Sequence, residues 1–201
     1  MIKSYKVQYR RSRLPLVAVL AIAVSLVGIF AAKISDRAAA QAAIDILARQ
    51  FVEKHKCRLA ELLRFVRKAG DGKSEKDRFL IVNPSLTPEH YVQCLFADGA
   101  RQALCEAASG AYRAPDDTRS SLASIWQIAE LQQLGFQLPS SNQNFQQRIG
   151  LPEPNEPLEA LAELYLKTLF YAYGARENTA LTINAPFLRK KNIPSECRPL
   201  S

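Results

Sequence analysis

The strongest constraint on this chain is an uncharged run of 19 residues near its N-terminus, from Leu14 to Ala32. As an α-helix the run would reach about 28 Å, close to the thickness of the hydrocarbon core of a bilayer. No face of it carries polar residues at helical spacing, as one face of a helix in a soluble core would. The sequence therefore predicts a single transmembrane helix over residues 14–32, with the lipid bilayer as its first partner.

Basic residues beside this run predict its orientation. Five of them fall within residues 1–13, whereas the next three, Lys33, Arg37 and Arg49, are spread over a longer stretch. The more basic flank of such a helix stays in the cytoplasm, so we expect a cytoplasmic N-terminal tail and an extracytoplasmic domain, periplasmic in a bacterium. The alternative is a signal peptide cleaved near Ala38-Ala39-Ala40. Charged residues separate that site from the apolar run, which favours an uncleaved signal-anchor.

The formal net charge is +8, but its position in the chain matters more than its size. Residues 70–201 carry 13 basic and 15 acidic side chains, so the predicted domain is close to neutral. A nucleic-acid-binding domain would show a basic stripe on its folded surface. We therefore expect no nucleic-acid partner.

The segment after the apolar run is predicted to be a long basic helix over residues 33–70. It contains neither Gly nor Pro before Gly70 and is rich in strong helix formers. Its apolar residues fall on one stripe, and Gly70-Asp71-Gly72 would end the helix. The apolar run can continue into this juxtamembrane helix without a break.

The rest of the chain predicts an α+β domain over residues 71–188, followed by a C-terminal tail, 189–201. Runs of β-forming residues predict a small antiparallel sheet of about three strands, with a hairpin signal at Asp98-Gly99. Two or more helices are expected to pack on this sheet. The predicted strands are 78–83, 90–97 and 102–108, and the predicted helices are 120–134 and 156–173.

The four cysteines raise the possibility of disulfides. If the hairpin loop is Asp98–Arg101, Cys94 lies opposite Cys105, and a non-hydrogen-bonded pair brings Cα atoms to about 4.5 Å, within disulfide range. A tighter turn would shift the register and part the two cysteines. Cys57 and Cys197 would remain as a second pair on the even count alone. The alternative is that all four cysteines are reduced.

No catalytic, metal or cofactor site is expected. His55 and His90 lack a motif that would place a nucleophile and an orienting group beside them. The cysteines lack the paired spacing of zinc sites, and no phosphate-binding glycine loop is present. Glu106, in the middle of a predicted strand, is expected on the exposed face of the sheet. The sequence therefore predicts a protein that is not an enzyme.

Several short motifs between residues 78 and 187 resemble a known family. The motifs are Tyr91-Val92-Gln93, Cys105-Glu106-Ala107, Leu131 to Phe136, Pro139 followed by Asn144-Phe145, and Thr168 to Gly174. Together they resemble the TY-Chap domains, which group type III secretion chaperone-like and YbjN-like domains. The resemblance implies an α/β domain that binds peptides or partner proteins and carries no active site.

The last predicted helix indicates where a partner would bind. Leu164, Leu166, Phe170 and Tyr173 cannot all face one sheet at 3.6 residues per turn. We therefore expect some of them to bind another protein or peptide, or a second copy of the chain. The predicted function is a membrane-anchored, non-enzymatic, chaperone-like binding module. The alternative is an accessory subunit of a larger membrane protein complex.

Overall fold

The computed structural model describes residues 16–69, 75–110, 124–138, 143–151, 153, 158–186 and 197, with side chains from residue 37 onward. The chain divides into two compact units, Met1–Ile44 and Asp45–Ser201. In its described part, the first unit is the beginning of helix α1 (Leu16–Ala69). The second unit contains the rest of α1 and every other described helix and strand.

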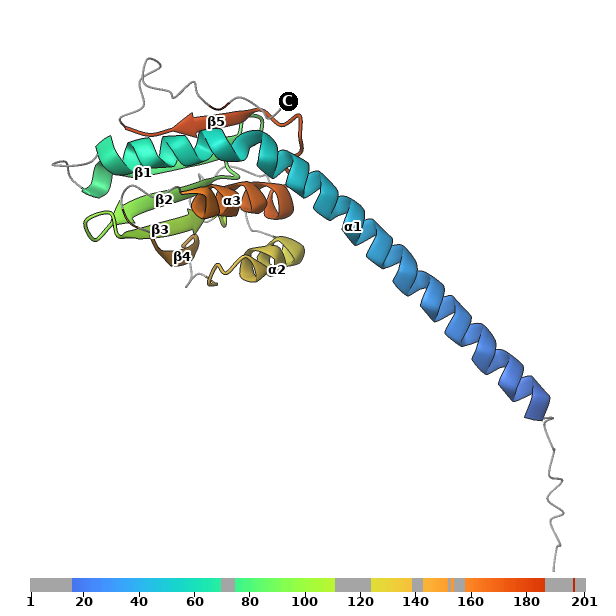
Figure 1. Cartoon of the computed structure of the whole chain (residues 1–201). Coiled ribbons are helices and arrows are strands. Elements are labelled where there is room, and N and C mark those ends of the chain that lie inside the picture. Colours follow the sequence, from blue (N-terminus) through green and yellow to red (C-terminus); the bar gives the residue numbers. More distant parts are fainter. Residues whose placement is uncertain are drawn as a thin grey trace, which may run out of the picture. The chain divides into compact units, whose positions relative to one another are not determined.

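The second unit is built on an antiparallel sheet of five strands in the order β4-β3-β2-β1-β5. In β2 and β3 every second side chain is buried, as expected for a sheet with one covered face. The helices lie on that face, and β4 and β5 form the two edges (Figure 1). The strands are β1 (Phe79–Pro84), β2 (Val92–Ala97), β3 (Gln102–Ala107), β4 (Phe145–Gly150) and β5 (Leu181–Asn184).

The second half of α1 packs into the core because its apolar residues recur at helical spacing. The large buried side chains of this stripe are Phe51, Val52, Leu59, Leu62, Leu63 and Val66. Complete burial of one such side chain stabilises a fold by about 1.5–3 kcal/mol. Near the end of the helix, the buried Arg67 donates from Nε to the carbonyl of Ala100 at 2.9 Å. Ala100 belongs to the β2–β3 turn, so this hydrogen bond ties α1 to the hairpin.

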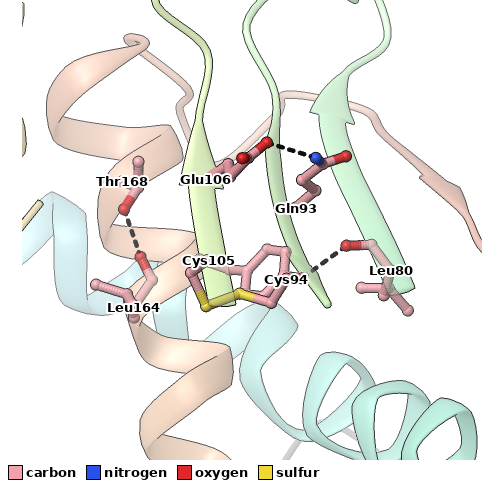
Figure 2. The surroundings of a disulfide bond; sticks show 8 residues. Leu80, Gln93, Cys94, Cys105, Glu106, Leu164 and Thr168 are labelled. Carbon is pink, nitrogen blue, oxygen red and sulfur yellow. Dashed lines mark hydrogen bonds between the residues drawn. A yellow bond between two sulfur atoms is a disulfide. The ribbon is translucent and has the colours of Figure 1, made fainter. Parts of the chain in front are cut away.

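The β2–β3 hairpin has the longer of the two loops that the sequence allowed. Ala97 pairs with Gln102, and Cys94 pairs with Cys105. A disulfide joins these two buried cysteines, whose Cα atoms are 4.0 Å apart (Figure 2). The predicted register and the predicted Cys94–Cys105 disulfide are therefore confirmed.

Helix α3 (Glu159–Lys167) continues into a π-helical turn, Thr168–Ala172. Tyr165 is fully buried, and its hydroxyl donates to the carbonyl of Leu80 in β1 at 2.7 Å. Phe170 packs against Phe51 of α1, with ring centroids 6.0 Å apart. The short helix α2 (Ile125–Gln133) packs against the π-helical turn. α3 thus contacts the sheet, and its π-helical turn contacts both other helices.

The predicted fold class needs correction in its sheet, which has five strands rather than about three. Two strands were not predicted from the sequence: β4, which has two large apolar residues, and β5, which has four residues in all. Edge strands of this kind carry little hydrophobic periodicity because they bury little on their outer side. The predicted helix 120–134 also differs, since α2 begins at Ile125, which is 88% exposed.

The predicted transmembrane helix is a second correction. Within the part of the chain that the structure describes, no helix is both long and apolar enough to cross a bilayer. α1 is one continuous helix from Leu16 to Ala69, as the sequence allowed, and its later half belongs to the α+β unit. From residue 37 its apolar side chains share the helix with charged ones, which gives it one buried side.

Some predictions fall outside the described residues. They are the tail 1–13, the side chains of the predicted membrane span, and the tail 189–201 apart from Cys197.

Replacing both Cys94 and Cys105 with Ala is expected to lower the free energy of unfolding by about 2–4 kcal/mol. The cross-link would no longer restrict the unfolded chain, and buried sulfur contacts would be lost. Urea denaturation of the full chain under non-reducing conditions measures the change. A free thiol at Cys94, found by peptide mapping of the native protein, would contradict this pairing.

Candidate binding cleft

A cleft of about 430 Å³ opens between α1 and the edge strand β5. Its volume falls in the range of ligand sites, about 300–1,000 Å³. Apolar side chains form its floor, and polar residues of α1 and of the turn before β5 form its rim. The floor consists of Leu59, Val82, Leu166, Leu181 and Ile183, and the rim of Lys54, His55, Arg58 and residues 177–180.

Helical spacing and strand pairing place these residues together. Lys54 and Arg58 are four residues apart and so share one face of α1, beside the buried stripe. On the other side of the cleft, Ile183 pairs with Val82 of β1. Leu181 lies two residues before Ile183 and points to the same, helix-covered face of the sheet. The cleft is therefore the place where the helix layer stops short of the edge of the sheet.

The rim is bridged at one end and positively charged. Lys54 donates from Nζ to the carbonyl of Glu177 at 2.9 Å, which joins α1 to the turn before β5. Arg58 is exposed and has no ion-pair partner among the described residues. Among the described residues that line the cleft, Glu177 is the one acidic residue.

His55 lies half-buried between the rim and the core. Its ring packs edge-on against Phe51, with centroids 5.1 Å apart, and its buried Nε2 has no hydrogen-bond partner in the described part of the chain. Burial, and then the positive charges of Lys54 and Arg58, hold the pKa of His55 below its ordinary value. This lowered pKa favours the neutral imidazole, which can donate or accept a hydrogen bond at Nε2.

On the opposite face of the sheet, a polar network surrounds Glu106. Gln93 and Gln146, from the two neighbouring strands, donate to its carboxylate oxygens at 2.7 and 3.0 Å. Figure 2 shows the hydrogen bond from Gln93 beside the Cys94–Cys105 disulfide. Glu106 is half-buried, and these hydrogen bonds join β2, β3 and β4. We assign the network a structural role.

The side chains predicted to bind a partner belong mostly to the core. Leu166, Phe170 and Tyr173 are buried, and Leu164 is half-buried. The prediction that these residues face a partner is wrong for the three buried ones, because other parts of the chain cover them. Tyr173 also donates its hydroxyl to the carbonyl of Ala108 at 2.7 Å. Only Leu166 reaches the cleft, as part of its floor.

The remaining candidate ligands and bases have structural roles. Cys57 of α1 forms a disulfide with Cys197, the pair that the even count left over. His90 stacks flat on Tyr173, with ring centroids 5.1 Å apart. Across the described ranges, no group of His, Cys, Asp and Glu side chains is arranged to hold a metal ion.

The cleft was not predicted from the sequence, although the sequence holds two signals for it. Thr182 and Ile183 are β-branched and lie in a short run after a glycine-terminated helix, which is typical of a strand. Lys54, His55 and Arg58 also cluster on one side of a helix. Neither signal shows that the two segments meet, because more than a hundred residues separate them.

Comparisons of the chain with protein-family models, with curated proteins and with solved structures gave no match. The resemblance to TY-Chap domains therefore stays a prediction.

The free energy of unfolding is expected to fall as the pH drops from about 8 to about 5, and His55→Gln should remove part of this fall. The pKa of His55 is lower in the folded chain than in the unfolded chain, where it is about 6.5. The contribution of neutral His55 to the free energy of unfolding is therefore fully present above about pH 6.5. This contribution is lost as the pH falls through the folded-state pKa. Urea denaturation at a series of pH values measures both slopes. Identical slopes for the two proteins would contradict the assignment to His55.

Leu166→Asp is expected to destabilise the domain by more than about 4 kcal/mol, because it places a carboxylate in the core. Leu86→Asp is the matched control, since Leu86 is 95% exposed and should tolerate the charge. Thermal denaturation followed by circular dichroism compares the two variants. Equal melting temperatures would mean that Leu166 is not a core residue.

Proposed function

We propose that the chain is a binding domain without enzymatic turnover, and that it holds an extended segment of another polypeptide as an added strand on β5. The observation that supports this best is the position of the cleft beside an edge strand. No described strand pairs with the outer side of β5. Extended peptides bind sheets in this way, with affinity from backbone hydrogen bonds and specificity from pockets for alternate side chains.

The pairing of β5 with β1 decides which of its backbone groups face outward. The N–H of Ser85 donates to the carbonyl of Ala180 at 2.8 Å. Hydrogen-bonded pairs recur at every second residue of an antiparallel ladder, so Thr182 also bonds to β1. The N–H and C=O groups of Leu181 and Ile183 then point away from β1. They are the groups that an added strand would bind.

The cleft supplies the pocket that such a strand needs. The side chains of Leu181 and Ile183 already line it. Side chains of an added strand would alternate in the same manner, so every second one would lie over the apolar floor. Burial of one large apolar side chain there would stabilise the complex by about 1.5–3 kcal/mol before entropic costs.

The two disulfides support a location outside the cytoplasm. Disulfides form and persist in oxidising compartments and are rare where thiols are kept reduced. We therefore place the domain in such a compartment, the periplasm if the host is a bacterium. The resemblance to TY-Chap domains points to a chaperone-like role there, in which the domain covers a partner's unpaired strand.

A second candidate function is that of an accessory subunit in a larger assembly. It is favoured by exposed apolar side chains on the helices, since Leu47 of α1 is 47% exposed and Trp126 of α2 is 53% exposed. Clustered exposed apolar surface often marks an interface. Association of this kind would be weakened by Leu47→Asp and left unchanged by substitutions in β5.

Ile183→Pro is expected to weaken peptide binding at least about tenfold, because one backbone hydrogen bond to the peptide is lost and the strand geometry changes. The substitution removes an outward-facing N–H while leaving the hydrogen bonds between β5 and β1 intact. The probes are short peptides selected against the full chain from a random displayed library. Titration by fluorescence anisotropy measures their affinity for each variant.

Ile183→Val is the matched control, because it keeps the backbone donor and most of the side chain. Thr182→Pro tests the register, since it should break the pairing with β1 and lower the melting temperature. If the Ile183→Pro protein is folded and binds the peptides as tightly as the unchanged chain, β5 is not the docking edge.

A further inference from the structure

The cleft has one closed end, and this restricts what can lie in it. The hydrogen bond from Lys54 to the carbonyl of Glu177 crosses from α1 to the turn before β5. A segment that runs along β5 toward the N-terminal end of that strand meets this bridge. The bound segment must therefore end at the bridge or turn out of the cleft.

The polar groups near the closed end distinguish between the two kinds of chain terminus. Lys54 and Arg58 are cations, and Glu177 is the one acidic residue among the described residues of the lining. An N-terminal ammonium would be repelled by the two cations, whereas a C-terminal carboxylate would be attracted. The guanidinium of Arg58, which has no ion-pair partner among the described residues, matches the planar geometry of a carboxylate.

His55 adds a second independent observation. Its Nε2 is buried and has no hydrogen-bond partner in the described part of the chain, although buried polar atoms are nearly always paired. The atom belongs to a residue that lines the cleft. Because Nε2 is buried, the imidazole would have to turn toward the cleft for this atom to donate a hydrogen bond to a ligand's carboxylate oxygen.

We propose that the cleft binds the free C-terminus of a partner polypeptide, with the terminal carboxylate at Arg58 and His55 and the last side chains over the apolar floor. This inference rests on the proposed function, that β5 accepts an added strand. The bound segment runs antiparallel to β5, because its C-terminus lies at the N-terminal end of that strand. The apolar floor selects a partner whose C-terminal residues are apolar.

The test uses the disulfide-bonded full chain and two libraries of random short peptides, one displayed with a free C-terminus and one with the C-terminus joined to the carrier. Peptides from the free-end library should dominate selection. Synthetic copies with an amidated C-terminus should bind roughly tenfold to a hundredfold more weakly than the free acids. Fluorescence anisotropy gives the affinities.

Arg58→Gln should weaken the binding of the free-acid peptides by a similar factor and leave the binding of the amidated peptides almost unchanged. The matched control is Lys56→Gln, since Lys56 lies on the same helix, pairs with Glu53 and does not line the cleft. Equal effects of the two substitutions would show general charge attraction and overturn the assignment to Arg58.

The outcomes separate this inference from the proposed function. One outcome is that free-acid and amidated peptides bind equally while Ile183→Pro still weakens the binding of both. The proposal of strand addition on β5 then holds, and the proposed carboxylate site is wrong. If neither library yields peptides that depend on β5, the proposed function fails and the carboxylate site fails with it. Circular dichroism of each variant confirms that the protein compared is folded.

Discussion

The burial of one apolar stripe of α1 is the interaction on which the rest of the domain depends. The stripe from Phe51 to Val66 is buried, and Phe51 packs against Phe170 in the π-helical turn that continues α3. Because this side of α1 is buried, Arg67 lies within hydrogen-bond distance of the carbonyl of Ala100 in the β2–β3 turn. The same burial also leaves Lys54 and Arg58, on the flank of the stripe, over the edge of the sheet. The cleft is a consequence of where this stripe ends.

The two edges of the sheet are protected in different ways. Beside β4, an isolated bridge between Gln137 and Gln146 occupies part of the outer side. Beside β5, the described chain offers no such partner, and Lys54 and Arg58 of α1 line the cleft next to this strand. Basic residues at an edge discourage indiscriminate strand pairing, because unrelated strands rarely supply the matching negative charge. Under the proposed function, a partner that supplies this negative charge would be accepted, and the same cations would give both protection and selectivity.

The Cys94–Cys105 disulfide removes an ambiguity that strand pairing alone would leave. A register slip by one residue turns every side chain of a strand to the other face of the sheet. Here one face is covered by helices, and the other holds the amide–carboxylate network of Glu106. The disulfide holds the register in which the small buried side chains of β3 meet the helices and Glu106 meets Gln93. The hydrogen bonds on one face and the packing on the other thus depend on the same pairing.

Local patterns in the sequence were enough to determine the α+β class, the helical character of residues 33–69 and the three central strands. They limited the β2–β3 hairpin to two registers, and the structure has the one with the longer loop, in which Cys94 pairs with Cys105. Only the tertiary structure decided that β4 and β5 complete the sheet, since edge strands depend on their neighbours more than on their own periodicity. It likewise decided that Phe170 and Tyr173 are core residues. The cleft could emerge only in three dimensions, because Arg58 and Ile183 are far apart in the chain and meet through the packing of a helix on a sheet.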